Sequence, residues 1–154
     1  LWTRQGFITQ TPGRVIDYSF IETDILEICK KYDVLHIGFD PYNARDLTQR
    51  LMTTYGLSCV QLRQGVATLS APSKELEKWV IEGKVDHGKN PVAAWNASNC
   101  EVITDSNGNI KVNKESNRAA KKIDGIAALI FGIAVWNTVP ELASIYSTPG
   151  NLAL

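Results

Sequence analysis

The chain has no excess charge of either sign, few cysteines and no long hydrophobic run. Of its 154 residues, 16 are Lys or Arg and 16 are Asp or Glu, so the formal net charge is zero. A balanced chain lacks the overall basic charge typical of a nucleic-acid binder, which leaves only a local basic patch open. The longest apolar run, Ile126 to Trp136, is too short for a bilayer of roughly 30 Å. Because a signal peptide is also absent, we expect no membrane association.

The cysteines and two missing motifs exclude several kinds of site. Cys29, Cys59 and Cys100 are odd in number, are widely spaced and form no CxxC pair. This pattern indicates free thiols in a reducing compartment, with neither a disulfide framework nor a zinc site. The sequence has no Gly-x-Ser-x-Gly, so Ser70 and Ser73 have little support as nucleophiles. It has no GxxxxGK[ST] either, so it carries no ATP site of its own.

The chain is long enough for one domain with a real core, and it starts without an initiator methionine. Its hydrophobic content of 44% and charged content of 21% are ordinary for a soluble globular domain. We expect one domain over residues 1–139 and a flexible C-terminal tail over 140–154. Because the chain begins at Leu1, it reads as cut from something longer.

Short apolar runs alternate with amphipathic segments. The runs predict strands, at residues 6–10, 15–18, 34–39 and 59–62. Helical spacing predicts helices, at residues 21–32, 44–55 and 117–137, with a further one that has Pro72 near its first turn and ends before Gly83. Residues 87–99 are expected to be irregular. Strands alternating with helices favour an α/β sandwich with a largely parallel centre.

A β-hairpin is predicted late in the chain. Its strands are Glu101–Thr104 and Ile110–Val112, and Asn107-Gly108 between them supplies the positive φ angles of a tight turn.

Two carboxylates are attached to segments with core character. Asp40 ends the apolar run 34–39, and Asp124 precedes the apolar run 126–136. A buried, unpaired carboxylate is costly, so such a residue usually has a partner, a metal or access to water. In parallel sheets, ligands bind at the carboxyl ends of strands, where we expect Asp40. One carboxylate from a strand end and one from a helix suit a divalent-metal site.

Each carboxylate also has a plainer interpretation. Asp40 precedes Pro41, and Asp-Pro turns are common. Asp124 follows Lys121 and Lys122, which would neutralise it, and acidic residues are favoured near helix N-termini. Asp17 is a weaker candidate for a third carboxylate.

Other polar residues have a functional and a structural interpretation. His87 lies in a polar loop, where a histidine can orient a phosphate or a water or shuttle a proton; otherwise it fixes the loop by a hydrogen bond. His36 is expected to be a satisfied core or sheet residue, and Asp46 a solvated helix residue. Asn-rich positions in the loop are expected to be structural, through Asx-type bonds, at Asn90, Asn96 and Asn99.

The basic residues are densest after the hairpin turn, at Lys111, Lys114, Arg118, Lys121 and Lys122. They lead into the segment that carries Asp124, so they are candidates for contacts with DNA phosphates. A solvated hairpin and helix end is the alternative.

Several segments occur together in a familiar order. They are Trp2-x-x-x-Gly6, Thr11-Pro12-Gly13-x-Val15-Ile16-Asp17-Tyr18, Phe39-Asp40-Pro41-x-x-Ala44, Gln64-Gly65, Leu69-Ser70-x-Pro72-x-Lys74-x-Leu76-Glu77, His87-Gly88-x-Asn90-Pro91-Val92, Trp95-Asn96-x-x-Asn99 and Lys122-Ile123-Asp124-Gly125-x-x-Ala128-Leu129. This ordered set resembles the nuclease domain of the large terminase subunit of tailed bacteriophages, over Trp2 to about Trp136.

The resemblance implies a fold and an activity. The fold would be a ribonuclease H-like three-layer α/β sandwich with a central mixed sheet and a β-hairpin insertion. The activity would be cutting of concatemeric viral double-stranded DNA during packaging, with two Mg²⁺ or Mn²⁺ ions. The implied partners are an upstream ATPase motor domain of the same protein, the small terminase subunit and the portal protein. The implied location is the cytoplasm of a bacterial host, with a phage or prophage gene.

In that family, acidic residues from three places hold the metals. Asp40 matches the second place and Asp124 the third, and His87 is a weaker catalytic candidate. The first place has no match, because the family's first strand would lie before Trp2. We therefore expect the first core strand and one metal ligand to be missing, and the isolated chain to have little activity. A non-catalytic remnant that binds DNA or a packaging partner is the alternative, and a phosphatase-like or receiver-like metal site is a weaker one.

Overall fold

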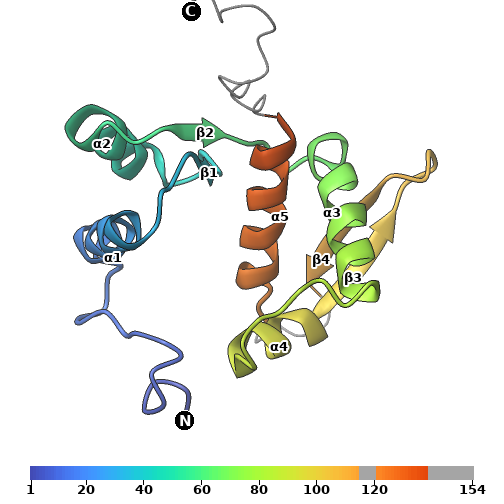
Figure 1. Cartoon of the computed structure of the whole chain (residues 1–154), viewed down its shortest axis with the longest axis horizontal. Helices are drawn as coiled ribbons and strands as arrows, with labels where there is room; N and C mark the ends of the chain where they lie inside the picture. The colour runs from blue at the N-terminus through green and yellow to red at the C-terminus, as the bar shows by residue number, and fades with distance from the viewer. Residues whose placement is uncertain (115–120, 139–154) are drawn as a thin grey trace, which may run out of the picture.

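A computed structural model describes residues 1–114 and 121–138. Over these residues the chain has mixed α/β structure (Figure 1). Its helices are α1 (Tyr18–Lys31), α2 (Arg45–Tyr55), α3 (Val66–Ile81), α4 (Pro91–Ser98) and α5 (Asp124–Thr138), and its strands are β1 (Ile37–Phe39), β2 (Cys59–Gln61), β3 (Cys100–Thr104) and β4 (Ile110–Lys114).

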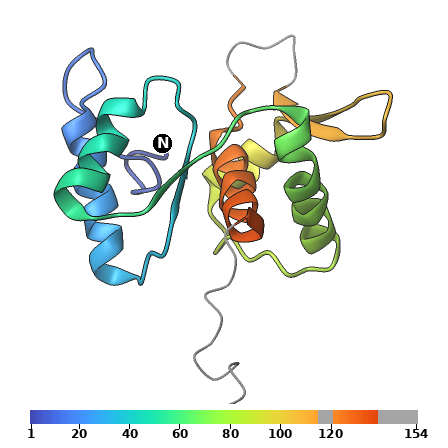
Figure 2. The ribbon, with the colours of Figure 1, turned by 90° about the horizontal axis from the view of Figure 1, so that it is seen from above.

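The elements are arranged around α5. β1 and β2 form a parallel pair in which Gly38 lies opposite Val60. α1 and α2 lie on one side of this pair and α5 on the other, with α3 and the antiparallel pair β3–β4 beyond α5 (Figures 1 and 2). We expected one central mixed sheet. The described residues form two separate two-stranded sheets, because the hairpin packs against α3 and not beside β1 or β2.

The core is built on two faces of α5. Ile130 and Ile133 pack against Leu69 and Leu76 of α3. Ala134 and Val135 pack on a second face against Leu62, which follows β2. Phe131 contacts both clusters. The apolar residues around most of the circumference of α5 predict burial on several sides, but Leu129 and Trp136 are 46% and 69% exposed, so one side of the helix is uncovered.

The β1–α5 contact depends on a residue without a side chain. A Cβ atom on Gly38 would lie 2.7 Å from Cγ2 of Val135, 3.3 Å from Cδ1 of Leu62 and 3.3 Å from the carbonyl oxygen of Phe131. The first separation is shorter than carbon atoms tolerate, and the backbone carbonyl cannot rotate away. Glycine at position 38 therefore sets how closely α5 approaches the strand.

The first residues of the chain differ from the prediction. Residues 6–10 form no strand; the segment turns back on itself through bonds such as Phe7 N to the carbonyl of Trp2, at 3.0 Å. Residues 15–18 form no strand either, because α1 begins at Tyr18. Asp17 is the N-cap of α1, since its carboxylate accepts from the amide of Ser19 at 2.9 Å. Apolar content alone suggested strands where no neighbouring strand is available to pair.

α2 and β2 match the predicted segments, and β1 is shorter than the predicted strand 34–39. α2 ends at Gly56, whose φ of 68° is the left-handed conformation expected of a glycine C-cap. α3 begins at Val66, well before the predicted start near Pro72, so Pro72 lies inside the helix. Its N-cap Gly65 makes no side-chain capping bond, so the usual start signal is absent.

The predicted irregular segment 87–99 contains α4. Asn90 caps this helix, accepting from the amides of Val92 at 2.9 Å and Ala93 at 3.2 Å, and Pro91 occupies its first turn. Asn-Pro at a helix start was the available signal, because proline has no amide to satisfy there.

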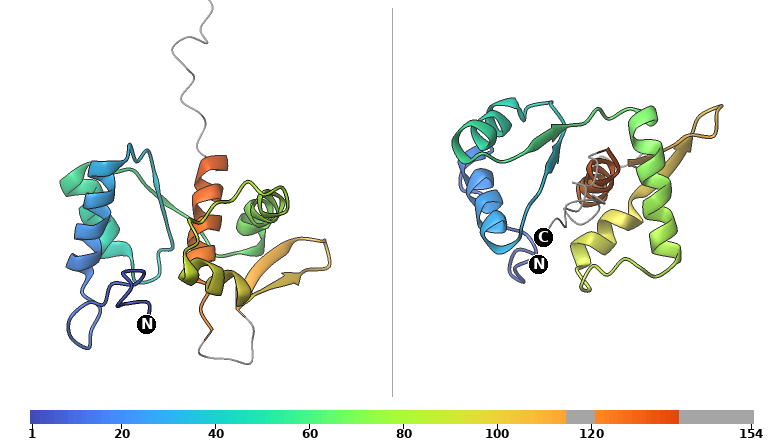
Figure 3. Two further views of the ribbon diagram at one scale, coloured as in Figure 1. Left: turned by 60° about the horizontal axis from the view of Figure 1, so that its bottom comes forward. Right: turned by 45° about the horizontal axis from the view of Figure 1, so that its top comes forward.

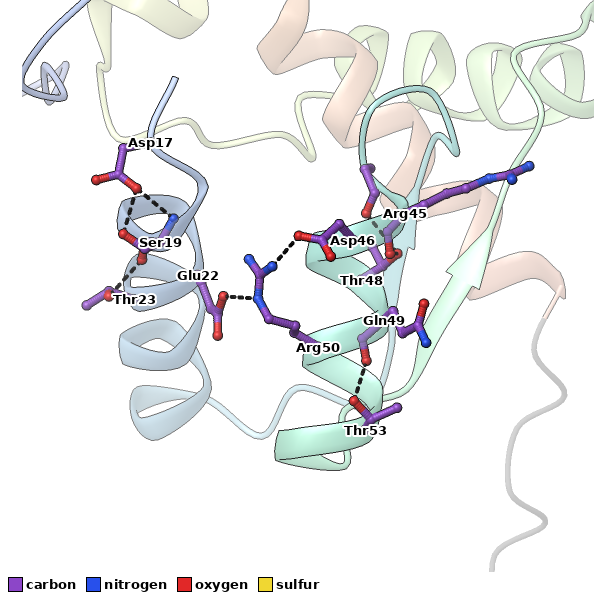
Figure 4. Close-up of polar contacts among 11 residues, drawn as sticks. Asp17, Ser19, Glu22, Thr23, Arg45, Asp46, Thr48, Gln49, Arg50 and Thr53 are labelled. Atoms are coloured by element: carbon purple, nitrogen blue, oxygen red, sulfur yellow. Dashed lines mark hydrogen bonds and ion pairs between the residues drawn. The ribbon is translucent and has the colours of Figure 1, made fainter. Parts of the chain in front are cut away.

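α1 is joined to α2 by an ion-pair network, shown in Figure 4. Nε of Arg50 donates to Oε2 of Glu22 at 2.8 Å, and the same guanidinium bonds Asp46. The hydrogen bond from Arg50, and then one from Tyr55, holds the pKa of Glu22 below its ordinary value. Because α1 has no fully buried residue, this network is a main polar attachment of the helix.

The three cysteines are free, as the sequence predicted. Burial raises the pKa of the Cys59 and Cys100 thiols, so neither favours the reactive thiolate. Among the described helices, none combines the length and apolar character that a membrane crossing requires.

Replacing Gly38 by alanine should push α5 away from β1. We expect Gly38→Ala to lower the free energy of unfolding by about 1–3 kcal/mol, the usual cost of overpacking a core. Urea denaturation followed by circular dichroism measures the change.

The matched control is Gly132→Ala in α5, where an added Cβ meets no atom within 4 Å. Alanine there should stabilise the helix by roughly 0.5–1 kcal/mol. Equal effects of the two substitutions would contradict the role given to Gly38.

Candidate metal centre

Asp40 directly follows β1 and is half-buried. Its Oδ1 accepts the amide hydrogen of Tyr42 at 2.8 Å, across Pro41. The plainer interpretation, a turn-forming Asp-Pro, is therefore correct for Oδ1, which takes part in the turn. The other oxygen accepts no hydrogen bond from the described residues, so the turn fixes the side chain and leaves a ligand atom available.

Asp124 is the first residue of α5 and is exposed. The predicted helix from residue 117 is wrong at its start, because Lys121, Lys122 and Ile123 are not helical. Asp124 therefore occupies the helix N-terminus, where unpaired amides favour a negative charge. This agrees with one of the two plainer interpretations of this residue and leaves its carboxylate open to solvent.

Two buried asparagines of the α4 region hold the chain on either side of Asp124. Oδ1 of Asn96 accepts the amide hydrogen of Gly125 at 2.6 Å, and Nδ2 of Asn99 donates to the carbonyl of Lys122 at 2.9 Å. The two asparagines are only 4% and 3% exposed. We expected Asn90, Asn96 and Asn99 to be structural through local bonds. Asn90 is, whereas the other two bond residues 29 and 23 positions away.

The chain after β2 leads toward the start of α5. Leu62, just after β2, packs against Ala134 and Val135 in the second half of α5. Two residues later, Gln64 lines a small cleft together with Ile123, which precedes α5, and Ala127, which lies in the first half of α5. Because β1 runs parallel to β2, with Phe39 opposite Gln61, the residues after β1 leave in the same direction. β1 meets α5 at Phe131 and Val135, in the second half of the helix, so Asp40 directly follows a strand that packs on the helix that Asp124 begins.

The other acidic candidates do not join these two. Asp17 caps α1, and Asp46 is a solvated helix residue, as predicted, that pairs with Arg50. Across residues 1–114 and 121–138, no three His, Cys, Asp or Glu side chains lie close enough together to hold an ion. The described residues therefore contain no ready-made metal site of three such side chains, and metal binding by Asp40 and Asp124 stays a prediction.

The histidines lie in different settings. His87 is exposed in the turn before α4, and its carbonyl accepts the amide of Asn90 at 3.0 Å. Its ring makes no bond within the described part of the chain, so the predicted loop-fixing side-chain bond is absent and a role at the site stays a prediction. His36 is half-buried and precedes β1, so it is not a sheet residue, but its Nδ1 lies 2.8 Å from Oγ of Ser58 and its ring is therefore hydrogen-bonded, as expected.

The predicted basic group divides into distinct positions. Lys111 is half-buried, and its ammonium donates to the carbonyl of Gln64 at 3.1 Å, so it joins the hairpin to the chain after β2. Lys114 and Lys122 are exposed, and Lys121 is half-buried. Arg118 lies outside the described residues. Contact with DNA stays a prediction for all of them.

The hairpin turn is organised by Asp105. Its Oδ1 accepts the amides of Asn107 at 2.8 Å and Asn109 at 2.9 Å, and its Oδ2 accepts Nδ2 of Asn109 at 2.9 Å. We predicted positive φ at both Asn107 and Gly108, and only Gly108, at 73°, has it. The loop is longer than a two-residue turn, so one left-handed residue closes it.

These bonds make the hairpin sensitive to acid. The side-chain bond from Asn109, followed by that residue's amide, holds the pKa of Asp105 below its ordinary 3.8. The stabilisation is complete above that ordinary pKa and is lost as pH falls through the lowered value. We expect the amide NMR shift of Asn109 to titrate with a midpoint below 3.8, and Asp105→Asn to abolish this titration. If the titration is unchanged in Asp105→Asn, another group causes it. The control variant, Asp33→Asn, should leave the titration of the Asn109 amide unchanged.

Comparison with known proteins identifies the chain. The sequence profile of the family described as "Terminase large subunit, endonuclease domain" matches residues 1–140. The chain belongs to this family. The terminase large subunit of Enterobacteria phage HK97 is 33% identical over 139 residues, covering 89% of this chain and 27% of that protein. Protein YmfN of Escherichia coli K12 is 30% identical over 132 residues, covering 86% of this chain and 29% of that protein.

A solved structure agrees with the family assignment. The crystal structure of the HK97 bacteriophage large terminase matches with a TM-score of 0.75 and 32% identity, covering 87% of this chain and 28% of that one. The similarity recognised from the ordered motifs is therefore confirmed. The chain spans less than a third of the curated relatives that it matches.

The residues that sequence reasoning undervalued are Asn96 and Asn99. The sequence predicts that both lie in a loop, and residues three positions apart share a face only in a helix. Once Asn90-Pro91 is read as a helix start, the same spacing places both side chains on one helix face.

Proposed function

We propose that the chain is part of the metal-dependent endonuclease module of a terminase large subunit, with a ribonuclease H-like sandwich, and that the whole subunit uses this module to cut concatemeric viral DNA during packaging. The observation that carries the proposal is the place of each carboxylate, because Asp40 directly follows β1 and Asp124 begins α5, the helix that packs on β1. Family membership supports the reaction class, and the two positions match the acidic positions that the resemblance implied.

The donor set suits a hard divalent cation such as Mg²⁺ or Mn²⁺. Both ligands are carboxylates, one oxygen of Asp40 is free of described hydrogen bonds, and Asp124 is exposed. Two carboxylates cannot complete a six-ligand shell, so water, phosphate oxygens or further protein ligands would supply the rest. Bound there, two cations would supply an activated water and stabilisation of the leaving oxygen.

The chain's own residues prepare this site. The amide of Tyr42 fixes the carboxylate of Asp40 in one orientation. The negative carboxylate of Asp124 lies beside the amides of the first turn of α5, which carry partial positive charge. Lys114 and Lys122, both exposed, would meet the phosphate backbone beside the carboxylates. His87 would orient a phosphate or a water from the turn before α4.

The wider assembly is also part of the proposal. The matched relatives are several times longer than this chain, and one of them is named as a terminase large subunit, which fits a nuclease module that works beside an ATPase motor domain. The small terminase subunit and the portal protein would be partners, in the cytoplasm of the bacterial host.

Removing either carboxylate should abolish metal binding at this site. Asp40→Asn and Asp124→Asn should each weaken Mn²⁺ binding by more than the roughly 10–100-fold typical of lost outer-shell partners. Titration calorimetry with Mn²⁺ measures affinity, and plasmid nicking measures activity. Asp46→Asn, which removes a solvated carboxylate of α2, is the control.

Binding that is unaffected in the double variant would move the metal elsewhere. DNA binding without metal binding or cleavage would favour a non-catalytic DNA-binding module.

Exposed lysines near the carboxylates should contribute to DNA affinity without sequence preference. Lys114→Glu combined with Lys122→Glu should weaken binding to duplexes of any sequence. It should also reduce the slope of log K against log salt by about 0.9 for each phosphate that the variant no longer neutralises. Fluorescence anisotropy at several salt concentrations measures both quantities.

Lys30→Glu combined with Lys31→Glu on α1 is the control with the same charge change. Lys111 is left unchanged because its ammonium holds the hairpin. If the two double variants bind DNA equally, the basic group is a solvated surface.

A further inference from the structure

The start of α5 lacks a cap from its own sequence. A helix begins with amide groups that have no partner within the helix, and a side-chain oxygen usually accepts one of them. The residues before Asp124 are Lys122 and Ile123, and neither side chain carries an acceptor. Gly125 donates its amide hydrogen to Asn96 instead, at 2.6 Å. The cap of α5 therefore comes from α4.

The bonding roles of the two asparagines are unambiguous. The partner of Asn96 is an amide hydrogen, so Asn96 presents its oxygen; the partner of Asn99 is the carbonyl of Lys122, so Asn99 presents its nitrogen. One asparagine is an acceptor and the other a donor. Both side chains are almost fully buried, where losing a partner leaves an unsatisfied polar group.

The two bonds attach to residues on either side of Asp124 and to no other part of α5. They hold the carbonyl of residue 122 and the amide of residue 125, which leaves the Asp124 side chain free. The approach is close, because a Cβ on Gly125 would lie 3.0 Å from Oδ1 of Asn96. α4 lies against the beginning of α5 (Figures 1 and 3).

α4 is itself held firmly. Asn90 caps its first turn, and Trp95 packs against Trp2 with ring centroids 5.5 Å apart. The thiol of Cys100 donates to the carbonyl of Asn96 at 3.3 Å. Because α4 is fixed in this way, the hydrogen bonds from Asn96 and Asn99 hold the backbone on either side of Asp124 in a defined place.

We propose that Asn96 and Asn99 are positioning residues that orient the carboxylate of Asp124 for metal binding. The inference rests on the proposed function of Asp124. Neither asparagine is assigned a contact with metal or DNA. They act through the backbone of residues 122–125, so the predicted effect is on metal affinity beyond any effect on stability.

The opposite roles of the two asparagines allow a matched experiment in the 154-residue chain. Asn96→Asp keeps the acceptor, whereas Asn99→Asp removes the donor, and both add the same charge at similar places. Asn96→Leu removes the acceptor at similar size. Arg50→Gln destabilises the α1–α2 contact and serves as the stability control. Mn²⁺ affinity is followed by paramagnetic broadening of amide NMR signals, and thermal unfolding and hydrogen exchange of the Gly125 amide are measured alongside.

The expected result separates the variants. Asn99→Asp and Asn96→Leu should bind Mn²⁺ about tenfold or more weakly, the lower end of outer-shell effects. Asn96→Asp should stay within about threefold of the parent and keep the Gly125 amide protected, as an acceptor is retained. Arg50→Gln should lose stability without losing affinity.

Two results would overturn the proposal in distinguishable ways. If Asn99→Asp and Asn96→Leu bind Mn²⁺ as tightly as the parent but unfold at a lower temperature, the two hydrogen bonds stabilise the fold and do not position Asp124. A parent chain whose Mn²⁺ binding does not depend on Asp124 would remove the proposed metal site itself, and the positioning role with it.

Discussion

The close packing of α5 on β1 is the contact on which the rest of the structure depends. Gly38 permits it, and Val135 and the backbone of Phe131 occupy the space that a side chain would take. From that contact, α5 extends one buried face to α3 and another to the residue after β2. The helix is thus the only described element that touches both groups of core residues, and its position determines where Asp124 lies relative to the strand that ends at Asp40.

The candidate site combines apolar packing with polar restraint. Packing sets the distance between α5 and β1, because a side chain at position 38 would collide with Val135. Hydrogen bonds from Asn96 and Asn99 act at the helix start and are strongly directional. Packing therefore fixes the separation of α5 from β1, and the two hydrogen bonds fix the backbone on either side of Asp124.

The parts of the fold that the sequence predicted are those with local signals. Gly56 ended α2, the hairpin had its turn residues, and Asp40 followed an apolar run that does contain β1. The errors have local causes as well. α3 starts at a glycine without a capping side chain, and α4 was missed because Asn90-Pro91 was read as loop chemistry. The start of α5 could not be predicted from the neighbouring residues, because the residue that caps it, Asn96, is 29 positions away in the sequence.

The order of these contacts along the chain has a consequence for biosynthesis. The described partners of α5, from Gly38 to Val112, precede it in the sequence, so a ribosome synthesises them before the helix that joins them. Domains generally acquire their long-range contacts only when both partners have emerged. A nascent chain therefore carries Asp40 before Asp124, and α5 can bury its apolar residues only after the residues that it packs against have been made.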